Sequence, residues 1–121
     1  MAKILVAEDS PTDLKFIESV LAPAGHQLSY AMDGEETERK VKSEPFDLLI
    51  LDVVMPKKSG FQICRDMKKD EKLRDIPVIM LTAKNQESDK LWGQKQGADE
   101  YLTKPCEPME LLKAVKKWLT R

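Results

Sequence analysis

Short runs of apolar residues alternate with longer segments of mixed character along this chain. Five runs have the length of a strand, and those at residues 4–7, 48–51 and 78–81 are apolar at every position. Continuous apolar strands are typical of parallel sheets that are buried on both faces. The runs at residues 28–31 and 101–103 include polar residues, so we expect these two strands nearer the edges of the sheet.

A segment of helical length follows each run. These segments are residues 12–21, 34–43, 60–69, 86–96 and 108–119. Most carry apolar residues at the spacing of one helical face. Residues 34–43 are mostly charged, which suggests a short or loose helix, and residues 86–96 contain only Leu91 and Trp92 as large apolar residues. The repeated strand–helix order predicts an α/β fold, a five-stranded parallel sheet with helices on both faces.

Composition narrows the class of protein. The chain has 121 residues, 41% of them hydrophobic, and a formal net charge of −1. This size suits one domain, and the pattern runs to the last residue, so we expect a single domain over residues 1–121 without an output domain. Acidic and basic residues are nearly balanced, so we do not expect the clustered basic face of a protein that binds nucleic acid. No apolar stretch approaches the roughly 20 residues of a membrane span.

Cysteine usage favours a cytoplasmic location. Cys64 and Cys106 have no partner at the spacing of a metal or redox motif. We therefore expect two reduced thiols in a cytoplasmic protein.

Polar residues with related chemistry end four of the five strands. They are Glu8 and Asp9 after the first, Asp52 after the third, Thr82 at the end of the fourth and Lys104 after the fifth. The carboxyl ends of parallel strands meet at one edge, where open α/β sheets bind their ligands. We expect three carboxylates, a hydroxyl and an ammonium group to gather there.

The three carboxylates predict a magnesium site. At an effective dielectric constant near 20, one pair of like charges about 4 Å apart costs about 4 kcal/mol. A divalent cation relieves this repulsion, and hard carboxylate oxygens together with water suit Mg²⁺. Asp9 and Asp52 are the predicted direct ligands, and Glu8 would act through water. The backbone carbonyl of Val54 would supply a further ligand.

Asp52 is the predicted nucleophile of this edge. A carboxylate can form an acyl phosphate by in-line attack on phosphorus. The ammonium group of Lys104 and the hydroxyl group of Thr82 would stabilise the phosphoryl oxygens. Each residue alone also fits a structural role, such as a helix cap or a loop position, but their combination at four strand ends favours a functional site.

These motifs resemble the receiver domains of two-component response regulators, in particular the stand-alone CheY-like kind. The motifs are Glu8-Asp9, the segment "LLILDVVMPKKSG" at residues 48–60, Thr82-Ala83 and Lys104-Pro105. The resemblance covers the whole chain and implies a flavodoxin/CheY-like sheet with strand order 2-1-3-4-5. It also implies that a CheA-like histidine kinase phosphorylates Asp52, that Thr82 and Lys104 sense the phosphoryl group, and that the bond before Pro105 is cis.

The resemblance further implies a switch and a partner surface. Tyr101 occupies the aromatic switch position, whose ring turns inward when Thr82 moves; an ordinary edge-strand tyrosine is the alternative. The fourth helix, fifth strand and fifth helix form the usual face for a downstream effector, where Trp92 and Tyr101 would make contact. A core or semi-buried Trp92 is the competing interpretation. We expect a monomer or a weak dimer.

Residues 85–105 are more specifically similar to PilH-type regulators of twitching motility. They contain a Lys-x-Trp-Gly-x-x-Gln-Gly pattern in the fourth helical segment. This similarity suggests pilus motility, chemotaxis or phototaxis as the process under control.

Two other classes of function compete with a phosphorylated switch. One is a constitutive interaction module that keeps the fold without using the phosphate. The other is an enzyme. A flavodoxin-like carrier needs a hydroxyl- and glycine-rich phosphate loop, but the carboxylates within residues 8–13 would repel a phosphate. A haloacid-dehalogenase-like phosphatase needs an acid at the position of Val54. We therefore expect no enzymatic activity beyond self-phosphorylation and self-dephosphorylation.

Overall fold

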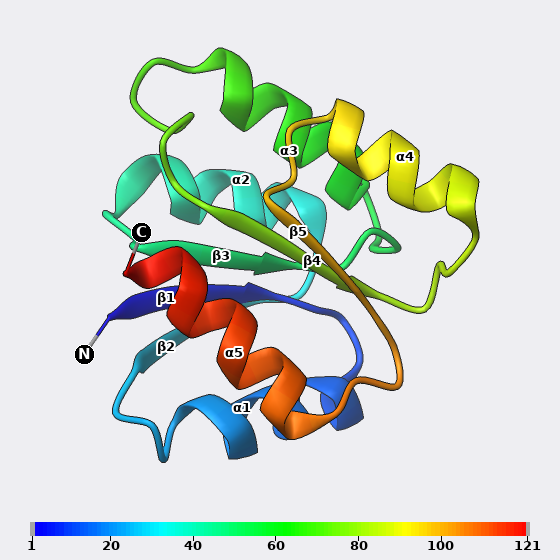
Figure 1. Ribbon diagram of the computed structural model, residues 1–121. Coiled ribbons are helices and arrows are strands. Elements are labelled where there is room, and N and C mark those ends of the chain that lie inside the picture. Colours follow the sequence, from blue (N-terminus) through cyan, green and yellow to red (C-terminus); the bar gives the residue numbers. More distant parts are fainter. Residues whose placement is uncertain (1, 121) are drawn as a thin grey trace.

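Strands and helices alternate strictly along the chain in the computed structural model, which describes residues 2–120 (Figure 1). The elements are β1 (Lys3–Ala7), α1 (Pro11–Leu21), β2 (Gln27–Ala31), α2 (Gly34–Ser43), β3 (Leu48–Leu51), α3 (Gly60–Lys69), β4 (Val78–Thr82), α4 (Glu87–Lys95), β5 (Glu100–Thr103) and α5 (Pro108–Leu119). Each one matches an element expected from the sequence, with ends that differ by one residue at most.

The five strands form one parallel sheet in the order β2-β1-β3-β4-β5. The predicted α/β class, strand order and edge positions of the second and fifth strands are confirmed. The register pairs Ala7 with Leu51, and the amide of Asp52 donates a hydrogen bond to the Ala7 carbonyl at 3.0 Å. As a result, the residues that follow β1 and β3 leave the sheet side by side.

Two helical layers cover the sheet (Figure 1): α1 and α5 lie on one face, and α2, α3 and α4 lie on the other. Successive strand residues point to opposite faces. Ile4 and Val6 therefore pack in the core beneath α1 and α5, whereas Leu5 packs in the core beneath α2 and α3. Burying each such side chain contributes about 1.5–3 kcal/mol, which makes the strands a rigid support for the residues at their ends.

The charged helix α2 is a regular helix of 10 residues, so the expectation of a short or loose helix is wrong. Its start is well capped, because the Asp33 side chain accepts a hydrogen bond from the Glu36 amide at 2.8 Å. Thr37 and Val41 are buried on the inner face. Capping and two buried side chains compensate for a sequence that is otherwise polar.

Helix α4 directs its two large apolar side chains toward solvent. Leu91 is 57% exposed and Trp92 is 49% exposed, while Gly93 is the buried residue of the helix. A Cβ atom at Gly93 would lie 2.8 Å from the Tyr101 ring, so the glycine allows the helix to rest directly on that ring. Trp92 is therefore exposed and not a core residue, and its role as an anchor for a partner stays a prediction.

The two cysteines lie in the interior of the protein. Cys64 and Cys106 are both buried, and neither forms a disulfide within residues 2–120. Burial raises the pKa of each thiol to about 11, which favours the protonated thiol over the thiolate at neutral pH. None of the helices described between residues 2 and 120 has the length and apolar character of a membrane span.

We expect His26 to make the protein less stable in mild acid. Its Nδ1 atom is buried without a hydrogen-bond partner among residues 2–120, and burial lowers its pKa below the ordinary value of 6.5. The unfolded chain therefore gains the proton first as the pH falls, which favours unfolding. In urea titrations between about pH 5 and 8, the free energy of unfolding of the wild type should fall relative to that of His26→Gln only below about pH 6.5. A difference that does not change with pH would contradict this expectation.

Candidate functional site

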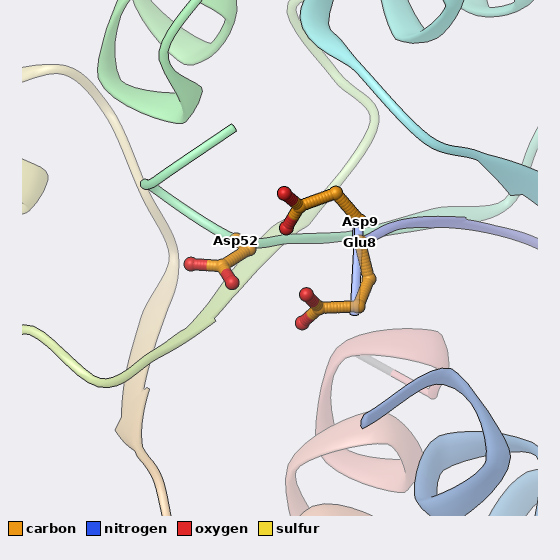
Figure 2. A group of neighbouring side chains, drawn as sticks. All are labelled: Glu8, Asp9 and Asp52. Atoms are coloured by element: carbon orange, nitrogen blue, oxygen red, sulfur yellow. The ribbon is translucent and has the colours of Figure 1, made fainter. Parts of the chain in front are cut away.

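Three carboxylates converge at the carboxyl ends of β1 and β3 (Figure 2). Glu8 and Asp9 follow β1, Asp52 follows β3, and each contributes an oxygen atom within 4.8 Å of the others. Glu8 is 1% exposed and Asp52 is 6% exposed, whereas Asp9 faces solvent. The structure thus brings together the three acidic residues that the sequence analysis selected.

This oxygen cluster fits a divalent cation. Carboxylate oxygens at such spacing, with one exposed member, match the hard ligands and retained waters that Mg²⁺ prefers. The Val54 amide donates a hydrogen bond to Asp52 Oδ1 at 3.1 Å, which fixes one carboxylate oxygen and ties residue 54 to the cluster. The predicted carbonyl ligand from Val54 stays a prediction.

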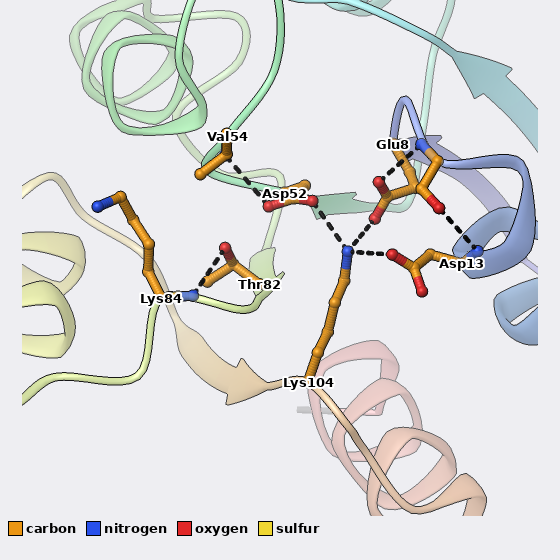
Figure 3. A network of polar contacts seen from close by, with 8 residues as sticks. Glu8, Asp13, Asp52, Val54, Thr82, Lys84 and Lys104 are labelled. Carbon is orange, nitrogen blue, oxygen red and sulfur yellow. Dashed lines mark hydrogen bonds and ion pairs between the residues drawn. The ribbon is translucent and has the colours of Figure 1, made fainter.

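Lys104 balances the charge of the cluster (Figure 3). Its Nζ atom lies 2.5 Å from Glu8 Oε1, 2.8 Å from Asp13 Oδ2 and 2.9 Å from Asp52 Oδ2. An ammonium group has three N–H donors, and these three carboxylates can use all of them. The backbone of Lys104 is fixed by a hydrogen bond from its amide to the Thr82 carbonyl at 2.9 Å. Its bond to Pro105 is cis, as the resemblance implied.

Asp13 is the residue of this network that the sequence analysis missed. It lies in the first turn of α1, where its amide donates to the Ser10 side chain at 3.3 Å. The available signal was its position four residues after Asp9, at the start of the helix that follows the Glu8-Asp9 pair. Only the observed direction of α1 shows that its first turn faces Lys104.

Burial and ionic contacts have opposite effects on the pKa values of Glu8 and Lys104. Burial raises the pKa of Glu8 to about 7, although Lys104 and the Ser10 amide oppose the shift. For Lys104, burial opposes the charged form, but the contacts with Asp13, Glu8 and Asp52 outweigh it and raise its pKa above the ordinary value. Lys104 therefore stays charged at neutral pH, and the carboxylates depend on this charge.

Thr82 and Tyr101 both bond to the backbone of Lys84. The buried hydroxyl of Thr82 accepts from the Lys84 amide at 3.4 Å, and the Tyr101 hydroxyl donates to the Lys84 carbonyl at 2.8 Å. The Tyr101 ring is partly buried beside the core under α4. The ammonium group of Lys84 lies 3.8 Å from the Asp89 carboxylate. The backbone of Lys84 therefore links Thr82 to Tyr101, so a displacement of Thr82 could move Tyr101 through this one residue.

The loop after Asp52 is pressed against the start of α2. The Gly34 amide donates to the Pro56 carbonyl at 3.1 Å, and a Cβ atom at Gly34 would lie 2.2 Å from the Lys58 carbonyl oxygen. Lys58 also forms ion pairs with Glu38 of α2 and Asp66 of α3. The position of the loop therefore depends on the absence of a side chain at residue 34.

We expect Gly34→Ala to weaken Mg²⁺ binding about threefold to tenfold and to lower the free energy of unfolding by about 1–3 kcal/mol. The added methyl group must push the loop, and with it residue 54, away from α2. Calorimetric Mg²⁺ titration and urea unfolding measure the two effects. Arg39→Ala, at an exposed position of the same helix, is the control. Unchanged Mg²⁺ affinity in Gly34→Ala would show that the loop and the acidic cluster are independent.

Two relatives are similar to this chain over nearly its whole length. The chain is 43% identical to protein PilH of Pseudomonas aeruginosa over 115 residues, which cover 95% of each protein. It is 39% identical to the transcriptional regulatory protein PhoP of Bacillus subtilis, covering 98% of this chain and 49% of PhoP. The chain thus spans about half the length of several transcriptional regulators that it matches.

Solved structures share the fold. Chemotaxis protein CheY4 of Vibrio cholerae superposes with a TM-score of 0.90 at 33% identity, covering 98% of this chain and 99% of that one. The receiver domain of sensor histidine kinase PA1611 from Pseudomonas aeruginosa superposes with a TM-score of 0.92 at 28% identity, covering 99% and 98%. The latter structure holds a magnesium ion in its active site cleft.

The family model for the response regulator receiver domain matches residues 4–116. Except for Lys3 at the start of β1, this match contains all five strands, together with the acidic, hydroxyl and lysine residues at their ends. Together with the sheet order and the PilH relative, it shows that the chain belongs to the receiver domains of two-component response regulators.

Proposed function

We propose that this receiver domain accepts a phosphoryl group from a histidine kinase on Asp52 and signals by changing its binding to a partner protein. The observation that carries the proposal is the setting of Asp52. Asp52 is 6% exposed, and its carboxylate lies within 4.8 Å of the Glu8 and Asp9 oxygens and pairs with Lys104 at 2.9 Å. A carboxylate in such a setting is held in place for reaction and is surrounded by groups that can manage phosphoryl charge.

The reaction is an in-line transfer. A carboxylate oxygen of Asp52 attacks phosphorus, the new O–P bond forms as the N–P bond of the phosphohistidine breaks, and the imidazole leaves with the electron pair and takes up a proton. Water attack on phosphorus later restores the carboxylate and releases phosphate. The chain catalyses only its own modification, so we propose that it is not an enzyme.

Binding residues and sensor residues divide the remaining roles. Asp9, Asp52 and the Val54 carbonyl would hold Mg²⁺, with Glu8 acting through water. The ion supplies positive charge that offsets the phosphoryl oxygens. Lys104 adds a second positive charge beside Asp52, and the Thr82 hydroxyl donates a hydrogen bond to the phosphoryl group.

Movement of Thr82 would then release the switch. When the Thr82 hydroxyl turns to the phosphoryl group, the Lys84 amide loses its acceptor, and the hydroxyl anchor of Tyr101 on the Lys84 carbonyl shifts with the loop. The Tyr101 ring already packs against Gly93 of α4. A change in this ring would alter the surface that α4, β5 and α5 share.

That surface is the proposed site for a downstream effector. On α4, Leu91 is more than half exposed and Trp92 is nearly half exposed. Tyr101 of β5 lies beside this helix. Exposed tryptophan and tyrosine are favoured anchors of protein interfaces. Because PilH is a relative with almost the same length, we propose a role in twitching motility, with chemotaxis or phototaxis as alternative outputs.

The experiment that tests this function uses a phosphoryl mimic. Trp118→Phe leaves Trp92 as the single tryptophan, and its fluorescence is followed while beryllium fluoride and Mg²⁺ are added. A change that requires both components, and that is lost in Asp52→Asn, is expected. No change, or an equal change in Asp52→Asn, would contradict the switch and favour a constitutive interaction module.

A further inference from the structure

The three carboxylates around Lys104 differ in what else they can bind. Glu8 and Asp52 belong to the group of oxygens that fits a metal ion, whereas among the described residues Asp13 is a partner of Lys104 outside that group. Asp13 is also the most accessible of the three. Its side chain is 38% exposed, against 2% for Glu8 and 7% for Asp52.

We propose that Asp13 is a positioning residue that keeps Lys104 beside the site when Glu8 and Asp52 turn to the metal and the phosphoryl group. This inference rests on the proposed function. Lys104 and a metal ion compete for the same two carboxylates in the unmodified protein. Asp13 provides an acceptor for which the metal does not compete, so the lysine can release the others without being left unpaired.

The first turn of α1 gives Asp13 a fixed place. Its amide bonds to the Ser10 side chain at 3.3 Å, and the amide of Leu14 donates to the Ser10 carbonyl at 2.9 Å. The Asp13 carboxylate therefore projects from a capped helix end, while its partner Lys104 projects from the end of β5. Figure 3 shows Asp13 approaching Nζ from the side away from Thr82 and Lys84.

Lys104 also has space in which to move. A pocket of about 230 Å³ lies between α1 and the segment after β5, and Asp13 and Lys104 both line it. The rest of its wall is largely apolar, including Phe16, Leu81 and Pro105. The aliphatic part of a lysine packs well against such a wall while its ammonium group stays with a carboxylate. A lysine held by Asp13 can thus shift within the pocket and remain next to Asp52.

The direction of the effect on Mg²⁺ follows from this competition. Without the Asp13 charge, Lys104 is shared by Glu8 and Asp52 alone and is harder for the cation to displace. We expect Asp13→Asn to weaken Mg²⁺ binding to the unphosphorylated protein about threefold to tenfold. Asp13→Glu keeps the charge and should restore most of the affinity.

A double-mutant cycle provides the test, with Mg²⁺ affinity measured by calorimetry in the wild type, Asp13→Asn, Lys104→Met and the double variant. If Asp13 acts through Lys104, its loss weakens Mg²⁺ binding in the wild-type background and has no effect in the Lys104→Met background. An equal loss of Mg²⁺ affinity in both backgrounds would show that Asp13 acts only as a nearby negative charge, which would overturn the proposal. No loss in the wild-type background would overturn it as well.

Two controls separate this inference from the proposed function. Glu107→Gln removes a negative charge from the exposed start of α5 and should leave Mg²⁺ affinity within about twofold. Modification of Asp52 is measured separately in Asp13→Asn with acetyl phosphate at saturating Mg²⁺. If the wild type binds Mg²⁺ and is phosphorylated, but Asp13→Asn has the same Mg²⁺ affinity as the wild type, only the positioning role of Asp13 is refuted. A wild type that does neither refutes both.

Discussion

Replacing Asp52 with asparagine is expected to reduce stable phosphoryl incorporation at least about a hundredfold. The amide of asparagine is nearly the same size as the carboxylate, but it is a poor nucleophile and carries no charge for Mg²⁺ or Lys104. Incubation with acetyl phosphate and Mg²⁺, followed by intact-protein mass spectrometry, measures the modified fraction. The same comparison with a phosphorylated histidine kinase tests the physiological donor class.

The Asp52→Asn variant should fold normally, so loss of modification cannot be attributed to unfolding. It removes one charge from a buried acidic cluster, which lowers repulsion between Asp52 and Glu8. We expect a free energy of unfolding without Mg²⁺ that equals or exceeds that of the wild type. Asp47→Asn, at an exposed position before β3, is the control that should keep full incorporation. Equal incorporation in Asp52→Asn would place the acceptor elsewhere.

Of the substitutions considered, Lys104→Met is expected to cause the largest decrease in the free energy of unfolding. Lys104 Nζ contacts three carboxylates within 2.9 Å, and its side chain is only 18% exposed. Methionine preserves the apolar length but leaves Glu8 and Asp52 buried without a counter-charge. Breaking a buried ion pair from one side costs about 3–5 kcal/mol, so the metal-free protein should lose a substantial part of its free energy of unfolding.

Mg²⁺ should restore most of this loss in Lys104→Met, because the ion replaces the missing positive charge and binds only the folded state. Urea unfolding with Mg²⁺ and with a chelator measures the recovery. Lys84→Met is the matched control, since the Lys84 ammonium is 3.8 Å from Asp89 and the Lys84 side chain is 45% exposed. That substitution should cost less than about 1 kcal/mol. Equal losses for the two lysines would contradict the role of Lys104 in balancing the cluster.

The sequence was informative where one short pattern decides the structure. Continuous apolar strands predicted a buried parallel sheet, and parallel strands bring their carboxyl ends to one edge. The meeting of Glu8 and Asp9 with Asp52 therefore followed from position alone. The resemblance to receiver domains supplied the strand order and the cis bond before Pro105, neither of which the hydrophobic pattern contains.

The sequence was less informative where packing between distant elements decides. The contact between Asp13 and Lys104 depends on the direction in which α1 leaves the sheet. Trp92 is exposed because Gly93, the smallest residue of α4, faces the Tyr101 ring. A hydrophobicity pattern assigns the inner face of a helix to its large residues, and this helix reverses that rule.

The regular helix α2 shows a third limit of the pattern. Its charges suggested weakness, yet the Asp33 cap and the buried Thr37 and Val41 stabilise it. Its role in the site comes from Gly34, where the absence of a side chain lets the loop after Asp52 approach. Close backbone contacts of this kind link residues far apart in sequence, so they are visible only in the folded chain.

Mapping the phosphoryl group to a single residue tests the central claim most directly. The protein is incubated with acetyl phosphate and Mg²⁺, the acyl phosphate is trapped by borohydride reduction, and the digested chain is sequenced by mass spectrometry. Our account predicts that Asp52 alone is reduced, and only when Mg²⁺ is present. Reduction at Glu8, Asp9 or Asp13 in place of Asp52, or modification that is independent of Mg²⁺, would contradict it.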